Sequence, residues 1–224
     1  MTGLRKLVLF DVDGTLVDSQ DHIHAAMAHA FAVTGQMLPP RAEVLSIVGL
    51  SLAEAVARLM PEAGAEMQTA VVEAYKSSFG VMRAKSMSPL FPGARAVLTA
   101  LAARPDVVLG VATGKSRRGL DHILAAHALQ GAFATCQVAD DHPSKPHPSM
   151  VLAALAETGV DPSMAVMIGD TSFDMEMGSA AGVATLGVSW GYHPVADLQS
   201  AGAGRIIDRF AALVPALDQM WSEA

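Results

Sequence analysis

Apolar and polar positions divide the chain into two kinds of region. Residues 7–10 form an uninterrupted apolar run that ends at a pair of aspartates, a pattern typical of a short strand buried on both faces. Between residues 19 and 85, apolar side chains recur at helical spacing, as they do from Ile23 to Phe31, and no stretch indicates a convincing strand. This part of the chain is therefore predicted to consist of several helices.

Two serines are predicted to cap helices in this region. Ser19 precedes the first helical stretch, and Ser51 precedes another with Glu54 three residues further on, which is the pattern of a capping box. In such a box the serine oxygen accepts a hydrogen bond from a backbone N–H group of the first helical turn. We therefore expect both serine side chains to be used at helix ends.

From residue 89 onward the pattern alternates between strands and helices. The predicted strands are residues 106–114, 132–140, 163–170, 183–191 and 204–209, and the predicted helices are residues 92–104, 116–129, 147–159, 172–182 and 210–221. Such alternation is typical of a parallel sheet with helices on both faces. The run at residues 7–10 must join the same sheet, so the helical stretch is an insert that follows the first strand.

The predicted fold class is α/β, with a Rossmann-like parallel sheet and an inserted all-helical cap. Residues 1–16 and 88–224 are expected to form the core, and residues 17–87 a helical insert. A chain of 224 residues with 51% hydrophobic and 17% charged residues can bury a core of this size.

Charge and cysteine content narrow the classes of function. The net charge is −7 and no run of lysines or arginines occurs, which argues against nucleic acid as a partner. The single cysteine, Cys136, excludes an intramolecular disulfide, fits a reducing cytoplasm, and is expected to be a small buried apolar side chain. No apolar stretch is long enough to span a membrane, and the N-terminal run lacks a signal-peptide cleavage site.

Polar residues follow the predicted strands at the end where ligands bind in parallel sheets. Asp11 and Asp13 follow the first strand, Thr113 ends the next, and Asp170 ends a later one. Two carboxylates as close as the first pair repel each other unless a positive charge lies between them. Carboxylates suit a hard divalent cation such as Mg²⁺, and Lys145 adds a positive charge that favours a phosphoryl group.

Four motifs carry a family resemblance. In chain order they read DVDGTLVDS, VATGK, SKPHP and IGDTSFDMEMGSAAG. Together they resemble the four motifs of the haloacid dehalogenase superfamily, and the resemblance covers the whole chain. The helical insert after the first motif is similar to the cap of subfamily I, which implies that residues 17–87 form a cap that moves against the core as a lid. The resemblance implies a phosphatase fold and chemistry, with Mg²⁺ as the cofactor.

The resemblance also implies a role for each matching residue. Asp11 would be the nucleophile that attacks phosphorus, and Asp13 would protonate the leaving oxygen and then take a proton from water. Asp11, the backbone carbonyl of Asp13, and Asp170 would hold Mg²⁺.

The remaining motif residues would support this chemistry. Thr113 would bind the phosphoryl group together with backbone N–H groups near Gly114. Lys145 would steady both Asp11 and the transferring phosphoryl group, and Asp174 would orient Lys145 or a metal-bound water.

Within the family, the residues favour a phosphatase. Haloacid dehalogenases lack the second aspartate and phosphonatases replace it with alanine, whereas this chain has Asp13. The β-phosphoglucomutases carry a cap histidine where this sequence has Ile23, which counts against a mutase without excluding it. The segments ATGK and SWGYHP resemble phosphoglycolate phosphatases, so a small phosphorylated metabolite is the expected partner. A pyrophosphatase, a nucleotidase and a regulator that binds phosphate without turnover are the alternatives, and the oligomeric state stays open.

Further positions are expected near the substrate. Lys115, directly after the Thr-Gly pair, either meets a substrate carboxylate or phosphate or is a solvated lysine. Gly49 and Ser51 lie in the cap loop that would close over the site and set specificity. Asp140 and Asp141 either border the site or belong to a strand-end turn.

Overall fold

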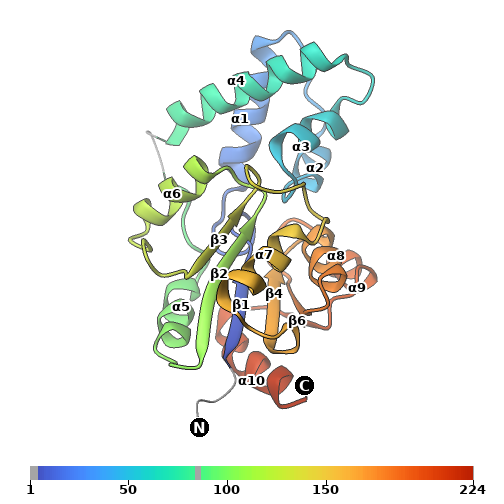
Figure 1. Ribbon diagram of the computed structural model, residues 1–224. Coiled ribbons are helices and arrows are strands. Elements are labelled where there is room, and N and C mark those ends of the chain that lie inside the picture. Colours follow the sequence, from blue (N-terminus) through green and yellow to red (C-terminus); the bar gives the residue numbers. More distant parts are fainter. Residues whose placement is uncertain (1–4, 84–86, 224) are drawn as a thin grey trace.

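The computed structural model describes residues 5–83 and 87–223, and it is built on one parallel sheet (Figure 1). The strand order is β3-β2-β1-β4-β5-β6. The strands are β1 (Lys6–Phe10), β2 (Val107–Thr113), β3 (Thr135–Val138), β4 (Ala165–Gly169), β5 (Ala184–Val188) and β6 (Arg205–Ile207). The winding direction reverses between β1 and β4, so the switch point where ligands bind in such sheets lies at the end of β1. The predicted α/β class is confirmed.

Helices lie in the insert and on both faces of the sheet. Those of the insert are α1 (Gln20–Val33), α2 (Arg41–Ser46), α3 (Leu52–Leu59) and α4 (Ala65–Arg83). The others are α5 (Ala94–Ala102), α6 (Arg117–Ala126), α7 (Ser149–Thr158), α8 (Ser172–Ala180), α9 (Val195–Ser200) and α10 (Leu213–Glu223), with short 3₁₀ turns at Pro162–Met164 and Phe210–Ala212.

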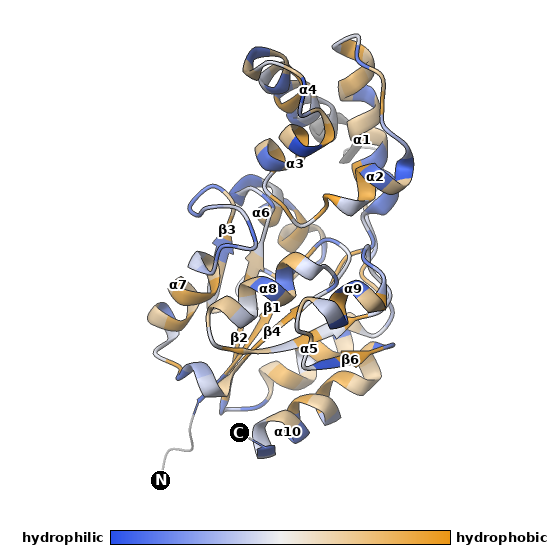
Figure 2. Cartoon of the chain, turned by 90° about the vertical axis from the view of Figure 1, so that its right-hand side faces the viewer, coloured by the Kyte–Doolittle hydropathy of each residue, from blue (hydrophilic) through white to orange (hydrophobic). Residues whose placement is uncertain are grey.

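The side chains of β1 from Leu7 to Phe10 point alternately to the two faces of the sheet. Both sets are apolar, because helices cover both faces. Val8 and Phe10 belong to a core shared with α5, α6 and α10, whereas Leu7 and Leu9 pack with α7 and α8. All four side chains are fully buried. Each contributes roughly 1.5–3 kcal/mol through its removal from water. Figure 2 shows the resulting hydrophobic colouring of the central strands.

The insert has a small core of its own. Met27 and Phe31 of α1 pack with Val44, Val56 and Val71 from the other three insert helices. In Figure 1 this group of helices stands beyond the carboxyl ends of the strands. The insert therefore lies over the edge of the sheet where the sequence places the polar residues. No helix in the described part of the chain has the length and apolar composition needed to cross a membrane.

Several local expectations differ from the structure. Ser19 and Ser51 occupy the predicted N-cap positions, but neither side chain accepts a capping hydrogen bond. The predicted capping box is wrong, because Glu54 pairs with Arg58 at 3.0 Å. The short helix α9 was not predicted, since only Leu198 of its six residues is buried and no apolar period results. The long insert helix ends at Arg83, and residues 84 and 85 of the predicted helix lie outside the described residues.

Candidate active site

Parallel strands bring polar side chains to one edge of the sheet. Asp11 follows β1, Thr113 is the last residue of β2, and Asp170 follows β4. Because β1 pairs with both β2 and β4, these three residues meet at the switch point. Each is at most 1% exposed, and Asp13 nearby is 8% exposed. The site is therefore a buried group of carboxylates.

Asp11 faces a buried lysine. Lys145 Nζ lies 2.9 Å from Asp11 Oδ1 as an ion pair and donates to Asp174 Oδ1 at 2.7 Å. Neither Asp11 oxygen makes a hydrogen bond of regular geometry within the described chain. Burial, opposed by Lys145 and reinforced by Asp174, raises the pKa of Asp11 from 3.8 to about 6. Asp11 is thus a buried carboxylate whose oxygens have acceptor capacity to spare.

The other two buried carboxylates are held by defined donors. Asp170 accepts hydrogen bonds from the Thr15 hydroxyl at 2.7 Å and from the Tyr192 N–H at 2.8 Å. Asp174 sits in the first turn of α8, where its Oδ2 accepts from the Thr171 N–H at 3.1 Å and hydroxyl at 2.7 Å in a capping box. Burial, together with the neighbouring carboxylates, raises the pKa of Asp170 well above its usual range.

These carboxylates fit a divalent cation. One oxygen from each of Asp11, Asp170 and Asp174 lies within 4.8 Å of the other two, and all three residues are buried. Lys145 can balance only one of the three charges, and buried like charges are unfavourable without further compensation. Hard ions such as Mg²⁺ prefer oxygen ligands, and the spare acceptor capacity of Asp11 suits such an ion.

Asp13 has separate partners. Ser19 Oγ donates to Asp13 Oδ1 at 2.6 Å, and Lys115 Nζ donates to Asp13 Oδ2 at 2.5 Å. Tyr192 Oη lies 3.0 Å from Ser19 Oγ, and since the single hydroxyl proton of Ser19 goes to Asp13, Tyr192 is the donor there. Burial raises the pKa of Tyr192 far above its usual range, so this donor keeps its proton. The Lys115 side chain is only 9% exposed and is not a solvated lysine.

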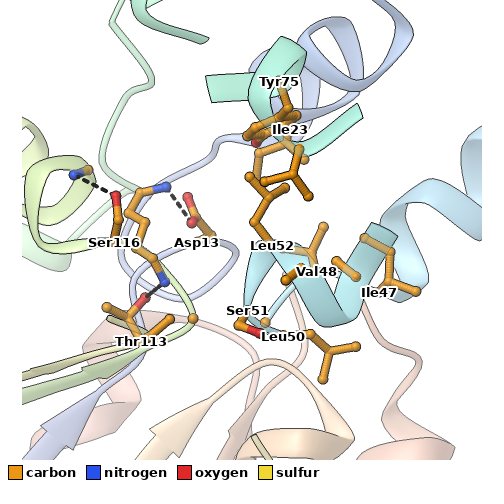
Figure 3. A pocket seen from close by; sticks show the side chains of 18 of the residues that line it. Asp13, Ile23, Ile47, Val48, Leu50, Ser51, Leu52, Tyr75, Thr113 and Ser116 are labelled. Atoms are coloured by element: carbon orange, nitrogen blue, oxygen red, sulfur yellow. Dashed lines mark hydrogen bonds and ion pairs between the residues drawn. The ribbon is translucent and has the colours of Figure 1, made fainter. Parts of the chain in front are cut away.

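A cavity of about 540 Å³ separates the insert from this sheet edge. The predicted site residues that line it are Asp11, Asp13, Thr113, Gly114 and Lys115 from the sheet side, and Gly49 and Ser51 from the insert. Figure 3 shows Asp13, Thr113 and Ser116 on one side and apolar side chains of the insert opposite them. Lys145, Asp170 and Asp174 are buried at the base of the site, around the nearly inaccessible carboxylate of Asp11.

The two acidic residues after β3 differ in position. Asp140 lines the cavity and accepts a hydrogen bond from the Arg117 N–H at 2.8 Å. Asp141 forms an exposed ion pair with the Arg117 guanidinium at 3.3 Å. Asp140 thus borders the cavity, and both carboxylates help to hold the start of α6.

The insert touches the sheet edge closely through the loop between α2 and α3. The Ser51 N–H donates to Ser144 Oγ at 2.9 Å, directly beside Lys145. A Cβ atom added to Gly114 would collide with the backbone oxygens of Gly49 and Leu50. Only glycine at position 114 therefore allows this approach, and the structure shows the insert in contact with the core.

Gly114→Ala is expected to weaken this contact and to lower kcat/KM about 10- to 100-fold, because overpacking costs about 1–3 kcal/mol and the opposing atoms are backbone. Steady-state kinetics and a thermal unfolding curve measure the two effects separately. Gly64→Ala is the matched control, since a Cβ atom there has nothing within 4 Å. An unchanged kcat/KM in the Gly114 variant would show that turnover does not need the contact.

Thr15, Tyr192 and Ser144 carried no individual assignment from the sequence, and Ser19 was expected only as a helix cap. Thr15 and Tyr192 fix Asp170, Ser19 fixes Asp13, and Ser144 anchors the insert loop. Thr15, Ser19 and Ser144 all lie within the recognised motifs, so their position next to the predicted catalytic residues was the only indication of a role in the site. Tyr192 lies in the SWGYHP segment, which resembles phosphoglycolate phosphatases without indicating a contact.

Comparisons with known proteins agree with this geometry. The family model described as haloacid dehalogenase-like hydrolase matches residues 8–188. The chain is 33% identical to "Probable phosphatase IndB" of Dickeya dadantii, covering 95% of this chain and 94% of the relative. It is 26% identical to the phosphoglycolate phosphatase of Pasteurella multocida, covering 95% and 98%. A solved haloacid dehalogenase-like hydrolase from Streptococcus pneumoniae is 25% identical, with a TM-score of 0.82 and coverage of 96% and 99%.

The sequence relatives match this chain over nearly their full length, and the matched region contains the acidic cluster. The buried carboxylates, the lysine and the parallel sheet are thus found in a chain whose relatives are named as phosphatases. The chain therefore belongs to the haloacid dehalogenase-like hydrolases and is a phosphatase of that family.

Proposed function

We propose that the protein is a Mg²⁺-dependent phosphomonoesterase that works through an aspartyl-phosphate on Asp11. The observation that carries this proposal is the Asp11 carboxylate, which lines the cavity, has acceptor capacity to spare, and lies 2.9 Å from the buried Lys145 ammonium. Nucleophilic attack requires the ionised carboxylate, and an adjacent positive charge favours ionisation.

The first half-reaction moves the phosphoryl group to the enzyme. An Asp11 oxygen attacks phosphorus, the bond between phosphorus and the ester oxygen breaks, and Asp13 gives a proton to the departing alcohol. Asp13 enters this step protonated, and Ser19 and Lys115 position it at the cavity. Thr113 and the N–H groups that follow it donate to the phosphoryl oxygens.

The second half-reaction returns Asp11 to its starting state. Water attacks phosphorus and gives its proton to Asp13, and the bond between phosphorus and Asp11 breaks to release inorganic phosphate. Lys145, held by Asp174 at 2.7 Å, balances charge on Asp11 in both steps. A Mg²⁺ ion held by Asp11, the backbone carbonyl of Asp13, and Asp170 would supply further charge compensation for the phosphoryl oxygens.

The insert, residues 17–87, is proposed to act as a cap. Its Gly49 and Ser51 line the cavity, and its loop reaches the sheet edge at Ser144 and Gly114. Closure would exclude water while the aspartyl-phosphate forms, and opening would release the products.

The proposed substrates are small phosphorylated metabolites, with the phosphoglycolate phosphatases as the best functional model. The relative from Pasteurella multocida carries that name. Ile23 lines the cavity, so the position where a phosphoglucomutase would carry its cap histidine holds an apolar side chain. This supports hydrolysis over transfer to a sugar.

The test is phosphate release from a panel of phosphomonoesters that includes 2-phosphoglycolate, with Mg²⁺ and with EDTA. We expect turnover with Mg²⁺ and its loss in EDTA. Hydrolysis that persists in EDTA would contradict the metal assignment. Turnover that appears only with a bisphosphate activator would indicate a mutase instead.

A further inference from the structure

The wall of the cavity opposite the carboxylates is apolar. It is built by side chains from α1, the loop between α2 and α3, α3 itself and α4: Ile23, Met27, Ile47, Val48, Leu50, Leu52 and Val72. Figure 3 shows Ile23, Val48 and Leu52 on the side of the cavity across from Asp13 and Thr113. A substrate bound at Asp11 by its phosphoryl group must therefore present its other end to these carbons.

This wall offers few polar partners. Among the described residues of the insert that line the cavity, the side chains with polar groups are Ser51, Tyr75 and Lys76. Lys76 is exposed and paired with Glu73 at 2.8 Å. On the core side Ser116, Arg118 and Asp140 line the same cavity and can serve polar groups of the alcohol. Hydroxyls or carboxylates that face the insert would lose their water without enough replacement hydrogen bonds. The wall therefore disfavours strongly polar alcohols such as sugars.

The size of the cavity also favours a substrate with a longer carbon skeleton. A volume of about 540 Å³ lies inside the range of roughly 300–1,000 Å³ that is common for pockets enclosing a drug-sized molecule. A two-carbon acid such as glycolate would reach the phosphoryl-binding end and leave Leu52 and Val72, the two partly exposed residues of the wall, in contact with water. The cavity is therefore better matched to a longer carbon skeleton.

We infer that the preferred substrates are phosphomonoesters of alcohols with an extended apolar part, which packs against the wall formed by Ile23, Val48, Leu52 and Val72. This inference rests on the proposed function and specifies the substrate class of the same site. The phosphoryl end is set by Asp11, Thr113 and Lys115, and chain length and polarity of the alcohol are selected by the insert.

The test uses a series of straight-chain alkyl phosphates from ethyl to hexyl, with 2-phosphoglycolate alongside. These primary alcohols have similar leaving-group chemistry, so differences in kcat/KM report contacts of the carbon chain. Burial of one methylene group is worth about threefold or fourfold in binding. We expect kcat/KM to rise by about threefold per methylene and to be higher for hexyl phosphate than for 2-phosphoglycolate.

Val72→Thr tests the wall directly, because threonine has nearly the shape of valine but carries a hydroxyl. We expect the dependence on chain length to flatten in this variant. Leu152→Gln is the control, since Leu152 lies on α7 outside the cavity and is 48% exposed, and its slope should equal that of the native protein. Circular dichroism establishes that both variants are folded.

The possible outcomes separate the two proposals. Mg²⁺-dependent hydrolysis with no dependence on chain length, or with 2-phosphoglycolate preferred, would overturn the inference and leave the phosphomonoesterase in place. A slope that survives unchanged in Val72→Thr would also overturn the assignment of the wall. Absence of hydrolysis across the whole series with Mg²⁺ would overturn the proposed function, and the inference with it.

Discussion

Asp11→Asn is expected to abolish phosphate release, with kcat reduced at least about a thousandfold, because an amide cannot act as the nucleophile. The substitution keeps the shape of the side chain, so the loss reports chemistry and not packing. Steady-state assays with Mg²⁺ and the best ester of the panel measure it. Asp18→Asn is the matched control, because Asp18 belongs to the same motif but is exposed.

The same variant is expected to be more stable than the native protein when no metal is present. The pKa of Asp11 is raised from 3.8 to about 6, so between these pH values the folded protein binds more protons than the unfolded chain. Stability therefore falls as the pH rises through this window, and the penalty persists above it. Two units of pKa correspond to about 3 kcal/mol at most, and Asp11→Asn removes this penalty.

Urea denaturation in EDTA at pH 5 and pH 8 measures this effect. The advantage of Asp11→Asn over the native protein should be larger at pH 8, where the native carboxylate is ionised. Addition of Mg²⁺ should stabilise the native protein more than the variant, because an ion that binds only the folded state adds to its stability. A variant that is less stable than the native protein at pH 8 in EDTA would contradict the electrostatic account of Asp11.

The meeting of Asp11, Thr113 and Asp170 could be predicted because it depends only on where the strands end and on their parallel arrangement. Asp11, Thr113 and Asp170 each stand at the carboxyl end of a strand, and in a parallel sheet those ends share one edge. Apolar runs in the sequence locate the strands well enough for this purpose. Errors of one or two residues at strand ends, as between the predicted 106–114 and the observed Val107–Thr113, leave the meeting point unchanged.

Side-chain partners set by loops could not be predicted in the same way. Ser19 has the sequence position of a helix cap, yet its hydroxyl turns to Asp13 because a buried carboxylate is the stronger acceptor. Tyr192 reaches Ser19 across 173 residues of chain, and no local pattern encodes that contact. Asp174 accepts a hydrogen bond from Thr171 at the start of α8 and also binds Lys145, and only the second contact was implied by the resemblance.

The apolar wall of the cavity could not be predicted from the sequence either. Helical spacing identifies the apolar residues of the insert, but it does not tell which of them face the insert core and which face the cavity. Phe31 and Val72 both pack in the core of the insert, yet Val72 also lines the cavity whereas Phe31 is 2% exposed and does not. The lining of the cavity therefore depends on helix packing that the sequence pattern leaves open.

Lys145→Met is expected to produce the largest loss of stability, about 3–5 kcal/mol at pH 8, because it leaves Asp11 and Asp174 buried without their positive partner. Burial alone would lower the pKa of Lys145, but the two carboxylates raise it above its usual value, so the lysine is charged in the native protein. Turnover should also be lost. Urea denaturation in EDTA measures the free energy of unfolding.

The pH dependence of that loss identifies its cause. Lys145 lowers the pKa of Asp11, so in its absence this pKa rises further and the folded variant takes up a proton that the unfolded chain does not bind near pH 5. The destabilisation should therefore be smaller at pH 5 than at pH 8. Adding Asp174→Asn to Lys145→Met should recover part of the stability at pH 8, because one uncompensated charge is removed.

Lys6→Met is the matched control for this experiment. Lys6 pairs with Asp106 at 3.0 Å, but their side chains are 20% and 34% exposed, so the loss should stay below about 1 kcal/mol and vary little with pH. If Lys145→Met lowered the free energy of unfolding no more than Lys6→Met does, Lys145 would not be the group that stabilises the buried carboxylates. A loss that is large at pH 8 and shrinks at pH 5 would show that this lysine compensates the negative charge buried around Asp11.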